Sequence, residues 1–258
     1  MSMSVSTYYY KKIDWEKKDK PILKKIENFC ESLPQSGYRS VAFHLKKEMK
    51  INKKRVSRIM QKNGLSCQQK KKFRPTTNSN HNMRKYPNLL AQRVESGDLE
   101  KVIVGDITAF DINNVTHYVA SLLDLTDRNP IGIAVSDKID TNLILAAFLD
   151  AKKNRPNLKN YLHHTDSDSR YCSEKYTAIL KEAEIEISMC KGNAYENAFS
   201  ESFNGVLKRQ EININEYSNL KEARESILNF RDKYVELRPH SSLGGLTPKE
   251  YAKKYLSN

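Results

Sequence analysis

Apolar residues recur at spacings of three and four in the first part of the chain, and this pattern predicts three short helices. The predicted helices cover residues 21–32, 38–49 and 53–63. The third lies between Asn52, a favourable N-cap, and Gly64, a favourable residue beyond a helix C-terminus. Three compact helices of this kind predict a small helix-turn-helix-like domain over residues 1–65.

A different pattern begins at Lys101, where β-rich runs are followed by alternating helical and β-rich segments. Strands are predicted over residues 102–110, 115–125, 129–137, 157–165 and 185–189. Helices are predicted over residues 140–153, 173–183, 195–210 and 219–237. This order predicts an α/β fold, a mixed five-stranded sheet flanked by helices, over residues 101–237. Residues 66–100 are polar and predict a basic linker arm, and residues 238–258 predict a C-terminal tail.

The net charge of the chain is concentrated in one segment. The whole sequence carries a formal charge of +13, and the forty residues from Lys46 to Lys85 hold 14 bases and one acid. The bases predicted to face outward lie on the third helix and in the arm: Lys53, Lys54, Arg55, Arg58, Lys62, Lys70, Lys71, Lys72 and Arg74. A basic segment beside a neutral domain is typical of proteins that bind double-stranded DNA, although a basic helix can also be merely solvated.

Several classes of protein are excluded by what the sequence lacks. No apolar run is long enough to span a membrane, and the first residues hold no apolar core of a secretory signal. The four cysteines are isolated, which argues against a zinc finger or a disulfide framework. We therefore expect a cytoplasmic protein associated with the nucleoid.

Three carboxylates stand where acids are unusual. Asp106 lies inside the first predicted strand, Asp166 follows the fourth, and Glu201 lies on a helix face opposite an apolar stripe. Asn197 and Lys208 share that face with Glu201. Oxygen ligands of this kind suit Mg²⁺, and a pair of ions can support phosphoryl transfer. By spacing alone, however, a cap, a turn or a surface position explains each acid more often than a metal site does.

His163 and His164 precede Asp166 on the fourth predicted strand. Adjacent strand residues point to opposite faces, so the two rings do not form a metal-binding pair. We expect one ring to be buried and the other to lie near the cleft.

The sequence motifs around the three acids resemble those of a known family. GDITAF surrounds Asp106, HTDSDSRYCSEKY surrounds Asp166, and SMCKGNAYENAFSESFNGVLK surrounds Glu201. SGYRSVAFHL, NKKRVSRIMQKNGL and KKFRPTT precede these words, and RPHSSLGGLTPKEY follows them. Over nearly its whole length the chain resembles the second-reading-frame product (OrfB) of the insertion-sequence three family of transposases, with their DDE integrase catalytic core.

This resemblance implies a ribonuclease-H-like core in which Asp106, Asp166 and Glu201 form the catalytic and metal-binding triad. It implies that Asn197 and Lys208 lie near DNA. It further implies two Mg²⁺ ions, for which Mn²⁺ can substitute, and cleavage and strand transfer at the ends of an insertion sequence. The implied partners are the transposon ends and target DNA, an upstream-reading-frame protein or fusion, and further copies of the chain on DNA.

Three departures from the family pattern keep other functions open. Ser167-Asp168-Ser169-Arg170-Tyr171 replaces the usual Arg-Gly-Ser-Gln-Tyr, and Ala109 replaces an aromatic residue. The 34 residues between Asp166 and Glu201 are one fewer than usual. One alternative is a catalytically decayed DNA-binding copy that inhibits transposition, with Asp168 as a competing ligand. Another is a structure-specific DNA nuclease that cuts without joining.

Overall fold

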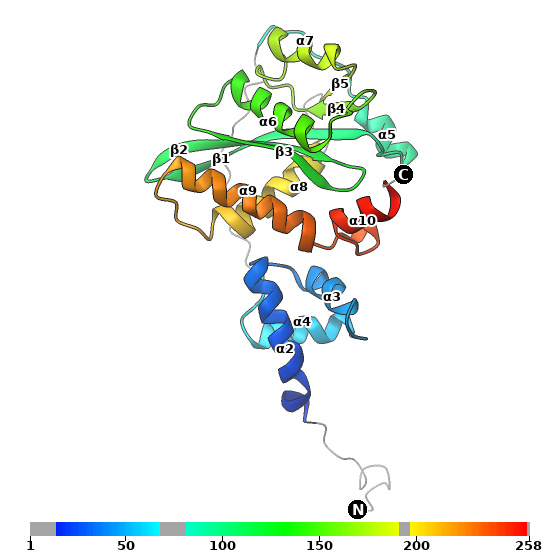
Figure 1. The fold of residues 1–258 in the computed structure, drawn as a ribbon, viewed down its shortest axis with the longest axis vertical. Helices are drawn as coiled ribbons and strands as arrows, with labels where there is room; N and C mark the ends of the chain where they lie inside the picture. The colour runs from blue at the N-terminus through cyan, green and yellow to red at the C-terminus, as the bar shows by residue number, and fades with distance from the viewer. Residues whose placement is uncertain (1–13, 68–80, 191–196, 257–258) are drawn as a thin grey trace, which may run out of the picture. The chain divides into compact units, whose positions relative to one another are not determined.

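A computed structural model describes residues 14–67, 81–190 and 197–256. The chain divides into two compact units, Met1–Cys67 and Gln68–Asn258, which are described separately below (Figure 1). Within the described residues no helix is both long and apolar enough to cross a membrane.

The first unit consists of three helices around a small apolar core. They are α2 (Trp15–Ser32), α3 (Tyr38–Lys46) and α4 (Lys53–Lys62). The predicted helices are present, but α2 begins six residues earlier than Pro21 because Asp14 caps it by accepting a hydrogen bond from the Lys17 amide. Asn52 caps α4 in the same way, as the sequence predicts. The most buried apolar side chains are Ile26, Leu33, Val41, Leu45, Val56, Ile59 and Met60.

The second unit is built on one five-stranded sheet. Its strands are β1 (Val102–Ile112), β2 (Val115–Asp124), β3 (Asn129–Ser136), β4 (Leu162–Thr165) and β5 (Glu186–Met189). They are arranged in the order β3-β2-β1-β4-β5. The first three strands pair antiparallel, whereas β4 pairs parallel with both β1 and β5. The predicted mixed sheet is confirmed, although β4 is shorter than predicted because residues 157–161 form a turn with Asn160 at φ 61°.

Helices cover both faces of this sheet (Figure 1). They are α5 (Leu90–Ser96), α6 (Thr141–Asn154), α7 (Glu174–Glu182), α8 (Ala198–Leu207), α9 (Leu220–Leu237) and α10 (Pro248–Tyr255). Alternation along β1 divides its side chains, so that Ile103 and Ile107 pack with α6 and α7 on one face. Val102 and Val104 pack on the other face with α5, α8 and α9.

Two shorter helical turns and the chain's last part complete this unit. A single π-helical turn (Lys208–Ile212) continues α8, and a 3-10 turn (Ser241–Leu243) follows α9. After α9 the chain folds back, placing the His240 ring 5.1 Å from that of Tyr234, and α10 packs against α9. The prediction that the helix after Tyr195 runs to residue 210 is wrong at its C-terminal end, because α8 stops at Leu207 and the π-helical turn follows.

The backbones of β3 and α6 approach each other closely at Gly132. A β-carbon built on this glycine would lie 2.3 Å from the Ala147 carbonyl oxygen and 3.0 Å from the Ala151 β-carbon. Glycine is therefore the residue that lets α6 lie flat on the sheet.

The second half of the predicted linker arm belongs to the core. Helix α5 lies within it, and Leu90 is only 2% exposed among the side chains of β1, β2 and α9. The prediction of an arm with little to bury is therefore wrong for residues 81–100. Lys70, Lys71, Lys72 and Arg74 lie outside the described residues.

Candidate active site

Asp106 lies in the middle of β1, and its carboxylate is held by two hydrogen bonds. Its Oδ1 accepts the Ile107 amide at 2.8 Å, and its Oδ2 accepts the Asn204 side-chain amide at 2.9 Å. Burial raises the pKa of Asp106 to about 7, with further contributions from the negative charges of Asp166 and Glu201. The two hydrogen bonds offset this rise in pKa only in part. A nearby positive charge would therefore stabilise the ionised form of Asp106.

The register of the sheet brings Asp166 beside Asp106. Val104 pairs with His164 in the parallel β1–β4 ladder, and each carboxylate follows two residues later. Asp166 is the first residue after β4. The last residue of β4, Thr165, accepts a hydrogen bond from the Cys190 amide at its carbonyl, at 2.9 Å. The Asp168 amide donates to Asp166 Oδ1 at 3.3 Å. Asp166 therefore lies at the carboxyl end of a parallel strand, where α/β sheets place ligands.

Two asparagines tie the helix that carries Glu201 to the sheet beside Asp106. Asn197 donates to the Gly105 carbonyl at 3.4 Å, and Asn204 joins Asp106 to the Ser121 hydroxyl. These residues stand four positions before and three after Glu201, on the same helix face. The charge of Glu201 contributes to the raised pKa of Asp106, although Glu201 itself is exposed.

The donor chemistry fits a hard divalent cation, but the side chains do not yet converge as a finished metal site. Across residues 14–67, 81–190 and 197–256, no three His, Cys, Asp or Glu side chains are grouped closely enough to hold an ion. Burial and, after it, the charges of Asp166 and Glu201 raise the pKa of Asp106, and a bound cation would oppose both effects. Asp106, Asp166 and Glu201 are the residues that would hold it.

Comparison with known proteins identifies the domains and the family of the chain. Integrase core domain models match residues 100–193 and 183–248, and an HTH-like domain model matches residues 16–73. The chain is 31% identical over 251 residues to the putative transposase InsK of insertion sequence IS150 from Escherichia coli, covering 95% of this chain and 88% of that protein. It is 31% identical to the transposase InsF of IS3A, also from E. coli, covering 80% of this chain and 73% of that protein.

The chain belongs to the insertion-sequence three family of transposases. The family supports a role in transposition, and the matched core models together with the sheet identify the fold as the ribonuclease-H-like integrase core. A 31 kDa protein of insertion element IS600 from Shigella sonnei is 32% identical, over 80% of this chain and 76% of that protein. The HTLV-2 integrase catalytic core, solved with magnesium, is 16% identical with a TM-score of 0.48, covering 59% of this chain and 97% of that one.

The basic residues of α4 in this transposase-family chain are partly engaged within their own unit. Asp19 accepts from Arg55 Nε at 2.9 Å and from Arg58 at 2.6 Å, and Glu16 forms an ion pair with Lys62. The Trp15 ring lies 5.4 Å from the Arg55 guanidinium and 5.5 Å from that of Arg58.

The bases predicted to face outward on α4 are largely exposed: Arg58 and Lys62 stay exposed although they are paired, and Arg55 alone is partly covered by the first turns of α2. Lys53 and Lys54 remain exposed at the start of the helix.

The altered segment after Asp166 forms its own set of contacts. Asp168 is 1% exposed and forms an ion pair with Arg170, whose amide also donates to it at 2.9 Å. The Asp168 carboxylate is therefore occupied by Arg170, another residue that departs from the family pattern. This pairing argues against the prediction that Asp168 competes as a metal ligand. Ser167 fixes the same segment by donating its hydroxyl proton to the Cys190 carbonyl at 2.6 Å.

Both histidines before Asp166 are buried, so the prediction that one lies near the cleft is wrong. His163 contacts the Tyr176 hydroxyl at 2.9 Å, and burial lowers the pKa of His163 to about 3. His164 lies on the other face between Ser188 and Cys190, at 2.8 and 3.2 Å. The strand alternation was predicted correctly, but helices on both faces bury both rings.

Sequence analysis missed Asn204, the residue that holds Asp106. A signal was available, since Asn204 follows Glu201 by three positions and so shares its helix face. Asn197 is only 6% exposed and reaches the β1 backbone, and Lys208 lies in the π-helical turn rather than in α8. Whether either contacts DNA stays a prediction.

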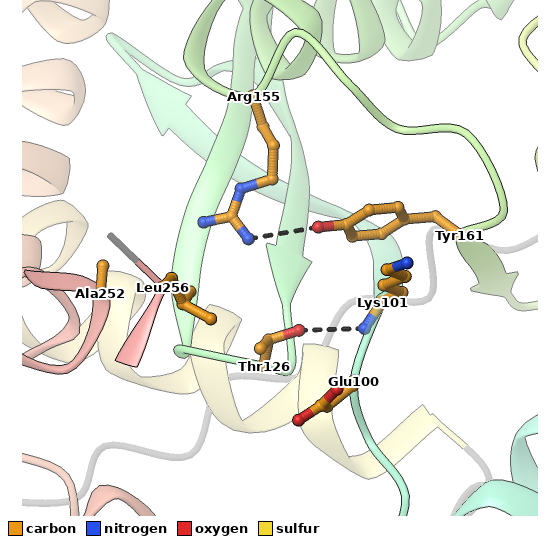
Figure 2. A pocket seen from close by; sticks show the side chains of 7 residues that line it. All are labelled: Glu100, Lys101, Thr126, Arg155, Tyr161, Ala252 and Leu256. Atoms are coloured by element: carbon orange, nitrogen blue, oxygen red, sulfur yellow. Dashed lines mark hydrogen bonds between the residues drawn. The ribbon is translucent and has the colours of Figure 1, made fainter. Parts of the chain in front are cut away.

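A pocket of about 370 Å³ lies elsewhere in the second unit (Figure 2). It is lined by Glu100, Lys101, Thr126, Arg155, Tyr161, Ala252 and Leu256. Arg155 pairs there with Asp124 and Asp127, two fully buried carboxylates. Burial raises the pKa of Asp124 to about 6 even though Arg155 opposes the rise. None of the three candidate catalytic acids lines this pocket, and we interpret it as a structural ion-pair cluster at the β2–β3 turn.

Proposed function

We propose that this chain is a DDE transposase that catalyses metal-dependent DNA cleavage and strand transfer at the ends of an insertion sequence. The observation that carries the proposal is the register that sets Asp106 of β1 beside Asp166 at the end of β4, in a chain of this transposase family. The charges of Asp166, at the end of β4, and of Glu201, on α8, add to the effect of burial on the pKa of Asp106. Perturbed acids of this kind are typical of functional sites rather than of surface acids.

Asp106, Asp166 and Glu201 would hold two Mg²⁺ ions, for which Mn²⁺ can substitute, and these ions would activate the attacking oxygen and neutralise the phosphodiester. The protein's own contribution is orientation. Asn204 and the Ile107 amide fix the two oxygens of Asp106, and the Asp168 amide fixes one oxygen of Asp166. Fixed carboxylates lower the cost of assembling the reacting groups.

The proposed reaction has two steps without a covalent protein intermediate. The oxygen of a water attacks a phosphorus at the element's end, the bond to the 3′ oxygen breaks, and that oxygen leaves as a 3′-hydroxyl. The 3′-hydroxyl oxygen then attacks a second phosphodiester, whose own 3′ oxygen departs with the proton. Each step breaks one phosphorus–oxygen bond for each one formed.

DNA would be held largely through its phosphates. The proposed contacts are the bases of α4, the bases of residues 70–74, and the residues that flank Glu201 in the sequence: Lys53, Lys54, Arg55, Arg58, Lys62, Lys70, Lys71, Lys72, Arg74, Asn197 and Lys208. Binding through phosphates weakens steeply as salt rises, because bound cations are displaced on association. We also propose that the chain acts as an oligomer on DNA and with an upstream-reading-frame protein or fusion.

A strand-transfer assay tests this function. The substrate is a labelled, pre-nicked duplex of the element's own end, with Mg²⁺ or Mn²⁺ and the upstream-frame protein. We expect joined product from wild type and at least about 100-fold less from Glu201→Gln, which keeps the side chain's shape but removes a metal-binding oxygen. Glu225→Gln, at an exposed position of α9, is the matched control and should join normally.

The other outcomes separate the alternatives. Cutting without joining would favour a structure-specific nuclease. DNA binding without any product, by a chain that also binds no Mn²⁺, would favour a decayed copy that competes for transposon ends. Equal joining by Glu201→Gln and wild type would refute the assignment of the triad.

A further inference from the structure

The segment that precedes the core domain runs along the exposed edge of the sheet. β5 is the last strand in the order β3-β2-β1-β4-β5, so no other strand of the described residues pairs with its outer side. The Pro87 carbonyl accepts the Met189 amide at 3.2 Å, and Ser188 Oγ accepts the amides of Leu89 and Leu90 at 2.9 and 3.3 Å. Residues 87–90 therefore cover part of this edge, where the Met189 amide would otherwise lack this backbone partner.

At its first described residue this segment reaches the turn that follows Asp166. His81 Nε2 lies 2.9 Å from the Ser167 carbonyl oxygen, and His81 Nδ1 lies 3.2 Å from the Met83 amide nitrogen. A backbone amide can only donate, so Nδ1 is the acceptor and the ring proton is on Nε2. His81 thus donates a hydrogen bond to the backbone directly after Asp166.

Further bonds fix the same turn from the side of the core. The Ser167 hydroxyl donates to the Cys190 carbonyl at 2.6 Å, and the Asp168 amide donates to Asp166 Oδ1 at 3.3 Å. The peptide that carries the Asp168 amide is the one whose carbonyl His81 holds. The orientation of a single peptide plane therefore links His81 to the carboxylate of Asp166.

We propose that His81 is a positioning residue for Asp166. It fixes the Ser167–Asp168 peptide so that its amide points at the carboxylate. This inference rests on the proposed function, because orienting Asp166 matters for the reaction only if Asp166 is a catalytic metal ligand. A carboxylate must be held within a fraction of an ångström to act well, and residues that orient a ligand typically change metal affinity by about 10- to 100-fold.

Hydrogen exchange on the metal-free full chain tests the contact without any catalysis. We expect His81→Ala to speed exchange of the Asp168 amide by about tenfold, because the peptide is then free to rotate. The amides of Leu89 and Leu90, which bond to Ser188, should keep their wild-type rates. His81→Gln retains a side-chain N–H donor and should restore slow exchange, and Asn82→Ala, at the exposed neighbouring position, should have no effect.

A metal titration tests the consequence for the reaction. In the strand-transfer assay, His81→Ala should need about tenfold more Mn²⁺ for half-maximal joining, whereas His81→Gln and Asn82→Ala should match wild type. A role confined to stability would instead lower the melting temperature and leave the Mn²⁺ requirement unchanged.

The outcomes distinguish this inference from the function on which it rests. Unchanged exchange at Asp168 in His81→Ala, or an unchanged Mn²⁺ requirement, overturns the role of His81 while wild type still joins DNA. A glutamine variant as impaired as the alanine variant overturns it as well. If wild type itself neither binds Mn²⁺ nor joins DNA, the proposed function is refuted, and the positioning role of His81 is refuted with it.

Discussion

Asp106 shows how one residue can be costly to the fold and useful to the site. Its carboxylate is surrounded by β1, β2 and α8, and its pKa of about 7 compares with roughly 3.9 in an unfolded chain. Between these values the folded protein binds more protons than the unfolded chain. The contribution of Asp106 to stability therefore falls as pH rises from about 4 to 7 and stays lowest above pH 7.

Asp106→Asn should consequently stabilise the metal-free chain at high pH. We expect its melting temperature to exceed that of wild type by at least about 2 °C at pH 8 and to match it near pH 4. Asn204 can turn its amide to accept from the new one, because the Ser121 hydroxyl can accept as well as donate. Asp111→Asn, at an exposed position of the same strand, is the control. No difference between pH 4 and pH 8 would argue against a raised pKa.

At the scale of elements, the packing of α6 on β3 depends on one glycine. A β-carbon at position 132 would lie 2.3 Å from the Ala147 carbonyl oxygen, which belongs to backbone and cannot turn aside. Gly132→Ala should therefore push α6 from the sheet and lower the free energy of unfolding by about 1–3 kcal/mol. Denaturant unfolding monitored by circular dichroism measures this loss.

Gly205→Ala is the matched control for that substitution. Gly205 lies inside α8, and a β-carbon there would meet no atom within 4 Å. Alanine favours a helix over glycine by about 1 kcal/mol, so this variant should be neutral or more stable. A Gly132→Ala variant as stable as Gly205→Ala would contradict the close approach of the two backbones.

At the scale of the whole molecule, the boundary of the core unit lies before residue 101. A chain of residues 81–258 keeps Leu90 in the core and the edge of β5 covered, whereas a chain of residues 101–258 lacks both. Burial of one leucine contributes about 1.5–3 kcal/mol, and an uncovered edge promotes association. We expect the shorter chain to melt lower and to aggregate, as measured by thermal unfolding and size-exclusion chromatography. Equal melting temperatures would restore the linker interpretation of residues 81–100.

The sequence by itself determined the local features of this protein. β-rich runs predicted the five strands, and apolar spacings of three to four residues predicted most helix ends outside α5 and α10, because hydrophobic periodicity records which face of a helix is buried. Asn52 was predicted as a cap from its residue type and its place before the helix, and its side chain accepts from the amide two residues ahead. An acid inside an apolar strand marked Asp106, and the family words marked Asp166 and Glu201.

Only the tertiary structure decided which distant polar groups meet. Arg55 and Arg58 pair with Asp19 at separations of 36 and 39 residues, and the amides of Leu89 and Leu90 find Ser188 nearly a hundred residues away. Asn204 reaches Asp106 across 98 residues, and His81 reaches Ser167 across 86. Such pairs leave no periodic trace in the sequence, since a hydrogen bond depends on where two backbones come together and not on the spacing of residues along either one.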